Sequence, residues 1–295
     1  VMNTKIILSY TIFENLPVII RNTRFVHEGE SSIVLERAMS LNLDLPDDRY
    51  EMVELTGAWA RERYVKTAPL HEGIQAIYSM RGHSSHQFNP FFALKRPETT
   101  EDAGEAIGIS LVYSGNFLGQ TAVDTFGVAR AMIGIHPEGF SWTLKKGETF
   151  QTPEAVLVYS GEGLGKMSRT FHRLYRKRLA RGYWRDRVRP VVINNWEATF
   201  MDFTEDKILK FAETARKLGV EMMVLDDGWF GHRDDDTSSL GDWYPDPKKL
   251  PQGIRGLAEK IENMGMKFGL WIEPEMVNKD SRLYEEHPDW VIRVP

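Results

Sequence analysis

The chain has 295 residues, a formal net charge of −5 and no cysteine. Its 37 basic and 42 acidic residues nearly balance, so charge gives no overall attraction to nucleic acid or to an anionic membrane. Without cysteine the chain has neither disulfides nor thiolate metal sites, which is usual in a reducing compartment. We find no signal peptide and no long apolar span, and we therefore expect a cytoplasmic protein with neither nucleic acid nor membrane as a partner.

The sequence pattern of residues 1–160 is typical of a β domain. Turn-forming sequences rich in Gly, Pro and acidic residues, as at 27–30 and 136–139, separate short apolar or alternating runs. The runs that are typical of strands are residues 6–10, 18–20, 33–35, 106–113 and 155–159. Regular short strands with this punctuation predict an antiparallel β-sandwich.

A linker helix is predicted over residues 161–188. The apolar residues that give this helix one buried face fall at steps of three and four: Leu164, Met167, Phe171, Leu174, Tyr175 and Leu179. Between residues 169 and 189 there are nine Lys or Arg and a single acid, Asp186. A nucleic-acid patch would bring an aromatic stacking platform or a binding motif with these charges, and we find neither. We interpret the basic run as the solvated face of a connecting helix.

From residue 189 onward, apolar strands alternate with amphipathic helices. A helix that begins after the capping residue Thr204 connects the first two strands, and a helix that ends near Gly265 connects the last two. The predicted strands are residues 191–196, 221–226 and 267–272. This order predicts parallel strands, and we assign residues 189–295 to the first three or so units of a (β/α)8 barrel.

The alternative to the barrel is a doubly wound parallel sheet. A doubly wound sheet usually carries a glycine-rich turn after its first strand, and residues 194–198 contain no glycine. A (β/α)8 barrel takes about 250 residues, so we expect its remainder to lie outside this chain. We expect the same for the start of the β domain, because Val1 already stands close to a strand-like run. Near the other end, residues 290–293 are predicted to form a further strand.

Asp226 and Asp227 are the first candidate functional residues. They follow the apolar run 222–225, at the exit of a predicted buried strand. Because an unpaired charge in a core is costly, we expect both carboxylates to face a cleft at the barrel mouth and to accept hydrogen bonds from sugar hydroxyls. The alternative is that one of them caps the next loop or pairs with Arg233. Binding is favoured over catalysis, because side chains adjacent on a strand diverge, whereas a retaining glycosidase needs two carboxyl groups about 5–5.5 Å apart.

Aromatic and acidic side chains accompany the strand ends. An aromatic ring stacks well on the apolar face of a sugar, but Trp196, Trp229 and Trp271 can equally be core residues, and Trp229 is the one we assign most readily to the core. Glu273 and Glu275 alternate with Trp271, which would place all three on one side of an extended strand. The residues alone leave it open whether these glutamates are catalytic or support their neighbours.

Neither a metal nor a cofactor is expected. His83 and His86 lack the further ligands of the usual zinc patterns, so we interpret them as part of a hydrogen-bonded turn. The acidic run 234–236 lacks the glycine and the glutamate of an EF-hand loop and is interpreted as solvated. This run belongs to the long connection between the second and third strands, and extra length at a barrel mouth usually shapes the pocket.

Four ordered motifs carry a resemblance to a known family: residues 194–199 (NNWEAT), 225–231 (LDDGWFG), 241–243 (GDW) and 270–277 (LWIEPEMV). Together they resemble the bacterial α-galactosidases of glycoside hydrolase family 36. The stretches that resemble that family's N-terminal domain are residues 57–63 (GAWARER), 82–86 (GHSSH) and 89–90 (NP). The resemblance thus covers essentially the whole chain.

The resemblance implies a β-supersandwich, a (β/α)8 catalytic barrel and a small C-terminal β domain. It implies hydrolysis of terminal α-1,6-linked galactose in melibiose, raffinose and similar sugars, with retention and without a metal. By position, Asp226 and Asp227 would hold the galactose hydroxyls at carbons 4 and 6. Trp271 would line the galactose subsite, and Trp196 would lie towards the leaving group. Family members are often homotetramers in which the N-terminal domain reaches a neighbour's site.

The chain departs from the family's pattern in its catalytic groups. The family's nucleophilic aspartate lies in a Lys-x-Asp type motif on the fourth barrel strand, and its acid/base aspartate lies on the sixth. We therefore expect no catalytic residue in this chain, both groups downstream of Pro295, and no activity of the chain alone. Two alternatives stay open: a galactosyl-transferring transglycosylase of the same architecture, and a non-catalytic carbohydrate-binding module.

Overall fold

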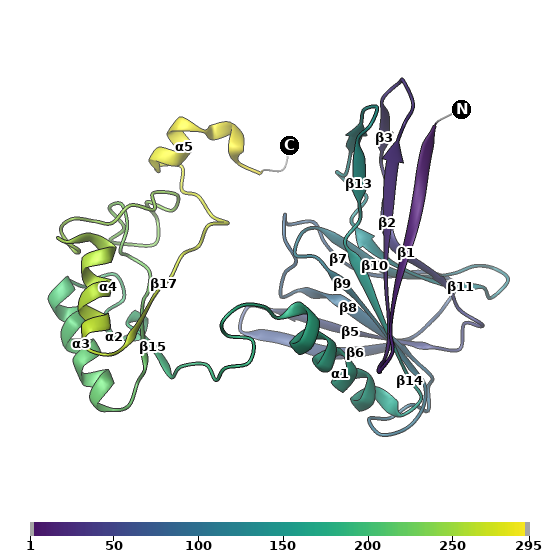
Figure 1. Cartoon of the computed structure of the whole chain (residues 1–295), viewed down its shortest axis with the longest axis horizontal. Helices are drawn as coiled ribbons and strands as arrows, with labels where there is room; N and C mark the ends of the chain where they lie inside the picture. The colour runs from purple at the N-terminus through teal and green to yellow at the C-terminus, as the bar shows by residue number, and fades with distance from the viewer. Residues whose placement is uncertain (1–2, 293–295) are drawn as a thin grey trace. The chain divides into compact units, whose positions relative to one another are not determined.

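The computed structural model describes residues 3–292 and contains two compact units, with the boundary between Arg181 and Gly182 (Figure 1). The first unit is built of strands and ends in a helix, whereas the second alternates strands and helices. None of the helices among the described residues has the length and apolar character needed to span a bilayer.

The first unit contains fourteen strands followed by a helix. The strands are β1 (Thr4–Phe13), β2 (Leu16–His27), β3 (Ile33–Leu35), β4 (Met39–Asp44), β5 (Glu51–Ala58), β6 (Arg61–Pro69), β7 (Gly73–Ser79), β8 (Phe88–Lys95), β9 (Ala106–Val112), β10 (Phe117–Val123), β11 (Ala129–Ile135), β12 (Trp142–Leu144), β13 (Thr149–Gln151) and β14 (Glu154–Ser160). The helix α1 (Gly163–Leu174) continues into a π-helical turn, η1 (Tyr175–Leu179). The five runs predicted as strands in this half fall in β1, β2, β3, β9 and β14, which confirms them.

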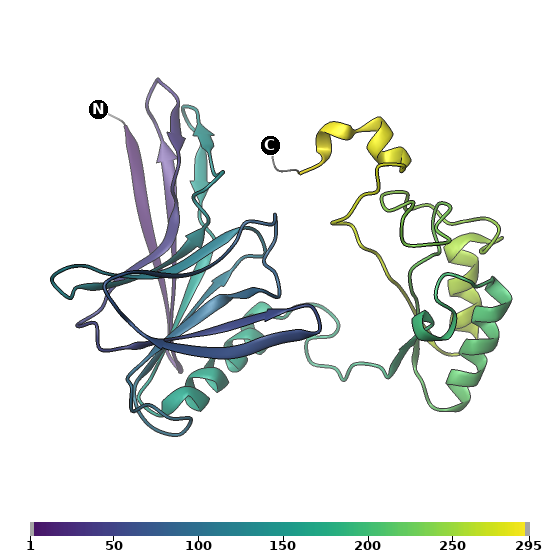
Figure 2. The same ribbon diagram turned by 180° about the vertical axis from the view of Figure 1, so that it is seen from behind.

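The strands of the first unit pair antiparallel in two stacked sheets and a small ribbon. The large sheet has the order β1-β2-β14-β9-β8-β5-β6, and β13 also pairs with β2. The second sheet has the order β4-β11-β10-β7, and β12 pairs with β3. The predicted antiparallel sandwich is thereby confirmed, with β1 at the outer edge of the large sheet (Figures 1 and 2).

Alternation along the strands fills two cores, one on each face of the large sheet. In β8, Phe92 and Leu94 point into the core between the sheets, where Phe117 and Ile133 of the second sheet meet them. Ala93, between them, points to the opposite face. Each fully buried Phe, Leu or Ile side chain contributes about 1.5–3 kcal/mol of transfer free energy, so this alternation fixes the register of the sandwich.

Helix α1 covers the outer face of the large sheet (Figure 1). Met167, Phe171 and Leu174 are buried there, as the spacing predicts. The close approach depends on Gly108 in β9, because a Cβ at that position would lie 2.4 Å from the Phe171 ring. The predicted buried face does not extend to Leu179, which is exposed, because the wider turn of η1 breaks the spacing of three and four residues.

The second unit contains three strands and several helices. They are β15 (Val192–Asn194), α2 (Trp196–Thr199), α3 (Glu205–Lys217), β16 (Met222–Leu225), α4 (Gly253–Asn263), β17 (Lys267–Leu270), α5 (Arg282–Glu286) and the 3-10 turn η2 (Pro288–Trp290). The three strands pair in parallel and in chain order, which confirms the predicted strand–helix–strand sequence. The Thr204 hydroxyl accepts a hydrogen bond from the Lys207 N–H and caps α3, also as predicted.

Two predicted strand segments are wrong. Trp196, placed at the end of the first strand, begins the short helix α2. Residues 290–292 are not a strand: Trp290 ends the η2 turn, and Arg293 lies outside the described residues. Pro288 accounts for this turn, because its fixed φ and missing N–H suit the first position of a helical turn.

Helices α3 and α4 pack against one face of the three-stranded sheet (Figure 1). Ile208 and Ala212 of α3, with Leu257 of α4, meet Met223 and Leu225 of β16 in a buried core. Because side chains alternate along a strand, the intervening residues point to the other face. That face carries Val192, Val224 and the residue that follows β16, Asp226.

Candidate functional site

Asp226 is held at the end of β16 by two asparagines, Asn194 at the end of β15 and Asn195 directly after it. The Asn194 amide donates a 2.7 Å hydrogen bond from Nδ2 to Oδ2 of Asp226. The Asn195 side chain, which is fully buried, accepts the backbone N–H of Asp226 at 2.9 Å. The parallel pairing of β15 with β16 brings these residues together. The carboxylate of Asp226 therefore has a fixed direction before any ligand is bound.

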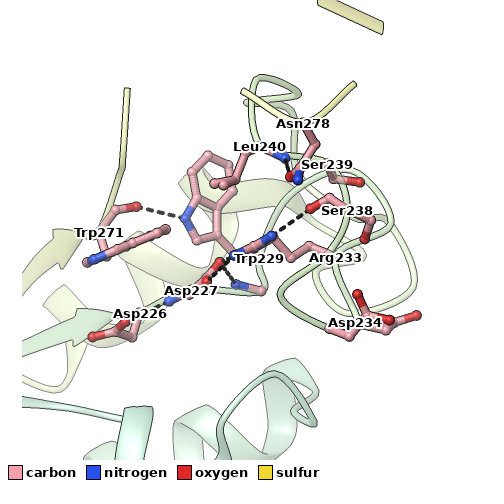
Figure 3. A network of polar contacts seen from close by, with 12 residues as sticks. Asp226, Asp227, Trp229, Arg233, Asp234, Ser238, Ser239, Leu240, Trp271 and Asn278 are labelled. Carbon is pink, nitrogen blue, oxygen red and sulfur yellow. Dashed lines mark hydrogen bonds and ion pairs between the residues drawn. The ribbon is translucent and has the colours of Figure 1, made fainter. Parts of the chain in front are cut away.

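Asp227 turns the opposite way and forms a buried ion pair. Its Oδ1 accepts from Arg233 Nε at 2.7 Å, and its Oδ2 accepts from Arg233 Nη2 at 2.9 Å. Oδ1 also accepts the backbone N–H of Gly228 at 2.7 Å. Figure 3 shows the guanidinium of Arg233 reaching the carboxylate from the loop that follows the strand. The sequence left this pairing open as the alternative to a ligand-facing Asp227, and the structure contains it.

The two carboxylates differ in how much acceptor capacity stays free. An ionised carboxylate offers about four lone-pair positions. Among the described residues, Asp226 uses two of them, for Asn194 and for the backbone N–H of Asp227, whereas Asp227 uses three. Both residues are little exposed, 8% for Asp226 and 6% for Asp227. Asp226 therefore keeps about two acceptor positions for a ligand, and Asp227 keeps about one.

Asp226 and Trp271 line the same hollow, which has a volume of about 690 Å³. The rest of its lining is Asn194 and five apolar residues, Val192, Ile193, Val224, Leu270 and Ile272. The backbone N–H of Trp271 donates to Leu225 O at 2.8 Å, so the indole stands directly after β17, beside the end of β16. A hollow with a carboxylate, an amide and an indole presents hydrogen-bond acceptors next to an aromatic surface, which is the chemistry that a sugar ring requires.

Trp229 belongs to the core beneath this hollow. It is almost fully buried, and its Nε1 donates a 2.9 Å hydrogen bond to the backbone O of Trp271 (Figure 3). The ring of Phe230 stacks near Trp271 at a centroid distance of 6.5 Å. The assignment of Trp229 to the core is thus confirmed, and its hydrogen bond fixes the backbone that carries the indole of Trp271.

Glu273 and Glu275 lie on an irregular segment. The expected alternation with Trp271 is wrong, because β17 ends at Leu270 and the period of two does not continue. Burial raises the pKa of Glu273, and the charges of Glu275 and Asp227 raise it further, while Arg233 opposes them. Glu273 therefore stands within electrostatic reach of the Asp227–Arg233 pair, whereas Glu275 is exposed.

Trp196 lies apart from the hollow. In α2 its ring packs edge-on against Phe200 at a centroid distance of 5.2 Å, and it is not among the residues that line the hollow. The hollow therefore brings Asp226 and Trp271 together, whereas neither Trp196 nor Asp227, whose carboxylate is held by Arg233, lines it.

The long loop after β16 is tied down by backbone and side-chain bonds. The N–H of Leu240 donates to Oδ1 of Asn278 at 2.8 Å, and the N–H of Asn278 donates to Leu240 O at 2.9 Å. Arg233 Nη1 donates to Ser238 O at 2.6 Å (Figure 3). Sequence reasoning missed these contacts, as it missed the roles of Asn194 and Asn195. Two adjacent asparagines at a strand exit were the available signal for the latter pair.

Among the described residues, no three His, Asp or Glu side chains come together as a set of metal ligands. The imidazole of His83 donates from Nδ1 to the neighbouring carbonyl oxygen, Ser84 O, 2.7 Å away. In the acidic run, Asp235 Oδ1 accepts from the N–H and the hydroxyl of Thr237.

A larger hollow, of about 860 Å³, lies in the first unit between β1, β2 and the second sheet. Its lining includes Arg21, Arg37 and Arg130 but no tryptophan. Its acid, Asp124, accepts two backbone N–H groups of its own turn. The smaller hollow, with its free carboxylate beside an indole, is the better candidate for a sugar site.

Two family models match the chain. The glycosyl hydrolase family 36 N-terminal domain matches residues 1–145, and the melibiase domain matches residues 149–295. The chain belongs to glycoside hydrolase family 36.

Relatives and solved structures agree with this assignment. The chain is 54% identical to α-galactosidase AgaA of Geobacillus stearothermophilus over 99% of its length, and 48% identical to α-galactosidase Mel36A of Lactobacillus acidophilus over 98%. It covers 40% and 39% of these two relatives, so it spans about 40% of the length of the curated relatives it matches.

Among solved structures, α-galactosidase AgaB of Geobacillus stearothermophilus has a TM-score of 0.95 at 53% identity, over 100% of this chain and 41% of that one. A variant of AgaA from the same organism, in complex with stachyose, has a TM-score of 0.94 at 53% identity, over 99% of this chain and 41% of that one.

Proposed function

We propose that this chain supplies part of the galactose subsite of a retaining α-galactosidase that hydrolyses terminal α-1,6-linked galactose from sugars such as melibiose and raffinose. The observation that carries the proposal is the carboxylate of Asp226 beside the indole of Trp271 in one hollow. Further support comes from the relatives, which are named as α-galactosidases, and from the stachyose and raffinose complexes of one of them.

The role proposed for each binding residue is the one that the resemblance to the family implies. Asp226 and Asp227 accept the galactose hydroxyls at carbons 4 and 6, and Asp226 takes the larger share because it has more free acceptor positions. Trp271 offers its ring to the apolar face of the sugar. Trp196, which stands further along the exit of β15, faces the leaving group and affects which leaving groups fit.

The nucleophile and the acid/base of the reaction belong to another part of the protein. A retaining mechanism needs two carboxyl groups about 5–5.5 Å apart across the scissile bond, and Asp227 is already engaged by Arg233. We therefore expect this chain alone to give no turnover of 4-nitrophenyl α-galactoside. Measurable turnover by the purified chain would show that the catalytic groups lie here.

Galactose binding tests the subsite directly. Titration calorimetry with galactose should give a weak but saturable isotherm, which Asp226→Ala abolishes. The matched control is Asp236→Ala, an exposed aspartate of the neighbouring loop, which should leave the affinity unchanged. Equal affinities of the wild type and Asp226→Ala would refute the assignment. Binding that instead depends on residues of the first unit would favour a separate carbohydrate-binding module.

We also propose that the protein is a homo-oligomer, in which the first unit contacts a neighbouring subunit. Support comes from Trp59, which is 86% exposed at the tip of the β5–β6 hairpin, where the backbone of Ala60 has a positive φ of 59°. An indole that projects from a hairpin tip is free to pack against a neighbouring subunit. Sedimentation velocity should show a species larger than the monomer, up to a tetramer, that Trp59→Ala weakens. A monomer at all concentrations would refute this.

A further inference from the structure

Lys249 is a buried cation that the proposed roles leave unexplained. It lies in the connection between β16 and α4 and is only 8% exposed. Its Nζ donates to Gly228 O and to Arg233 O, both at 2.9 Å, and it pairs with Asp234 Oδ1 at 2.8 Å. An ammonium group has three donors, so all of them are engaged.

The two carbonyls that Lys249 binds stand at the ends of one turn. Gly228 directly follows Asp227, and Arg233 is the residue whose guanidinium holds the Asp227 carboxylate. Within this turn the glycines Gly228 and Gly231 both have positive φ, 92° and 57°, a conformation that glycine adopts at little steric cost. Lys249 therefore joins the two backbone segments whose separation sets the position of Arg233 relative to Asp227.

The contacts of Lys249 indicate that it orients the backbone around it more than it stabilises the fold. Its acidic partner Asp234 has a side chain that is 77% exposed, so this ion pair contributes little. A buried ammonium is costly unless it is fully hydrogen-bonded, and here two backbone carbonyls provide most of that bonding. Its ammonium also lies over the ring of Phe203, 5.3 Å from the centroid, which keeps the side chain in one direction.

We propose that Lys249 is a positioning residue of the sugar subsite, which fixes the turn from Gly228 to Arg233 and thereby the carboxylate of Asp227. The inference rests on the proposed galactose site. Lys249 acts through Arg233 and makes no contact with the sugar itself. Its removal lets the turn relax, moves the guanidinium away from Asp227, and leaves a carboxylate that no longer meets a sugar hydroxyl.

The test compares two adjacent lysines. Lys249→Met keeps the unbranched chain up to the ε position and removes the ammonium donors, whereas Lys248→Met makes the same change at an exposed lysine beside it. The loss of one hydrogen bond to a charged group corresponds to about tenfold or more in an equilibrium constant. We therefore expect the dissociation constant for galactose to rise at least about tenfold in Lys249→Met and to stay unchanged in Lys248→Met.

A second readout separates positioning from simple destabilisation. In the wild type the Arg233 Nε–H, hydrogen-bonded and buried, should give a slowly exchanging ¹⁵N NMR signal, assigned with Arg233→Lys. That signal should broaden or exchange rapidly in Lys249→Met. It should persist in Ile261→Val, which weakens the core of the same unit without touching the turn. If Lys249→Met does not fold, Lys249→Gln, which keeps two N–H donors, takes its place.

The outcomes separate the inference from the function on which it rests. If the wild type does not bind galactose, the proposed subsite fails, and the Arg233 signal alone decides whether Lys249 positions the pair. If the wild type binds galactose and Lys249→Met binds it equally well with the Arg233 signal intact, the positioning role is overturned. Loss of affinity to the same extent in Ile261→Val would also overturn it, since the effect would then follow stability.

Discussion

Removal of Arg233 should be the most damaging single change in the second unit. The side chains of Arg233 and Asp227 are only 4% and 8% exposed and meet through two hydrogen bonds. Breaking a buried pair by removing one partner leaves an uncompensated charge and costs about 3–5 kcal/mol. We expect Arg233→Met to lower the free energy of unfolding by this amount. The matched control, Arg255→Met, breaks an exposed pair with Glu259 and should cost about 0.5 kcal/mol or less.

Urea unfolding followed by tryptophan fluorescence measures this difference. Six of the chain's eight tryptophans lie between residues 182 and 295, so the signal reports mainly on the second unit. The double variant Asp227→Asn/Arg233→Met removes both charges, and the cycle should give a coupling free energy of about 1–3 kcal/mol. If Arg233→Met cost no more than Arg255→Met, or if the two changes were additive, the description of a buried, mutually dependent pair would be refuted.

Three further predictions concern packing, capping and charge. Gly108→Ala should destabilise the first unit by about 1–3 kcal/mol in thermal unfolding, because the added Cβ meets the ring of Phe171; an unchanged midpoint would contradict the close packing of α1. Thr204→Ala should cost about 1 kcal/mol, and Thr204→Ser should restore it, since the capping hydroxyl is what α3 loses. The raised pKa of Glu273 means that the folded state favours the neutral carboxyl group. At low pH, where the group is neutral in both the folded and the unfolded state, it does not change the free energy of unfolding. As the pH rises from the ordinary pKa of glutamate through the raised pKa of Glu273, ionisation lowers the free energy of unfolding. Glu275→Gln should lower the pKa of Glu273 in a ¹³C NMR titration, and no change would show that the two carboxylates do not interact.

Local signals in the sequence predicted the framework of the second unit correctly. Thr204 caps α3 through its hydroxyl, and apolar spacing marks the helices and strands, because both depend on residues close along the chain. The predicted runs did not include β4 to β8 or β10 to β13 of the first unit. Of these strands, β6 (Arg61–Pro69) lacks the apolar alternation that marks a half-buried strand, because both of its faces are exposed.

The sequence predicted where the candidate site lies but not which of its side chains form hydrogen bonds and ion pairs with one another. The end of a parallel strand predicts where Asp226 stands, since neighbouring strand ends meet at one edge of the sheet. The choice between a ligand and Arg233 for Asp227 depends on the path of a loop, and the pattern of residues left both open. Lys249 gave no signal at all, because a lysine between a strand and a helix is usually solvated, and its burial depends on carbonyls of Gly228 and Arg233.

The two edge strands of the three-stranded parallel sheet favour aggregation. Among the described residues, β15 and β17 each pair on one side only, with β16. Unpaired backbone groups along such strands can pair with strands of other molecules. Val192 and Val224 line the hollow on the face away from the helices, and burying them in such a contact would favour association. The chain prepared by itself should therefore aggregate through this unit as its concentration rises, with light scattering as the sign. Val192→Lys should suppress that scattering more than it lowers the unfolding midpoint.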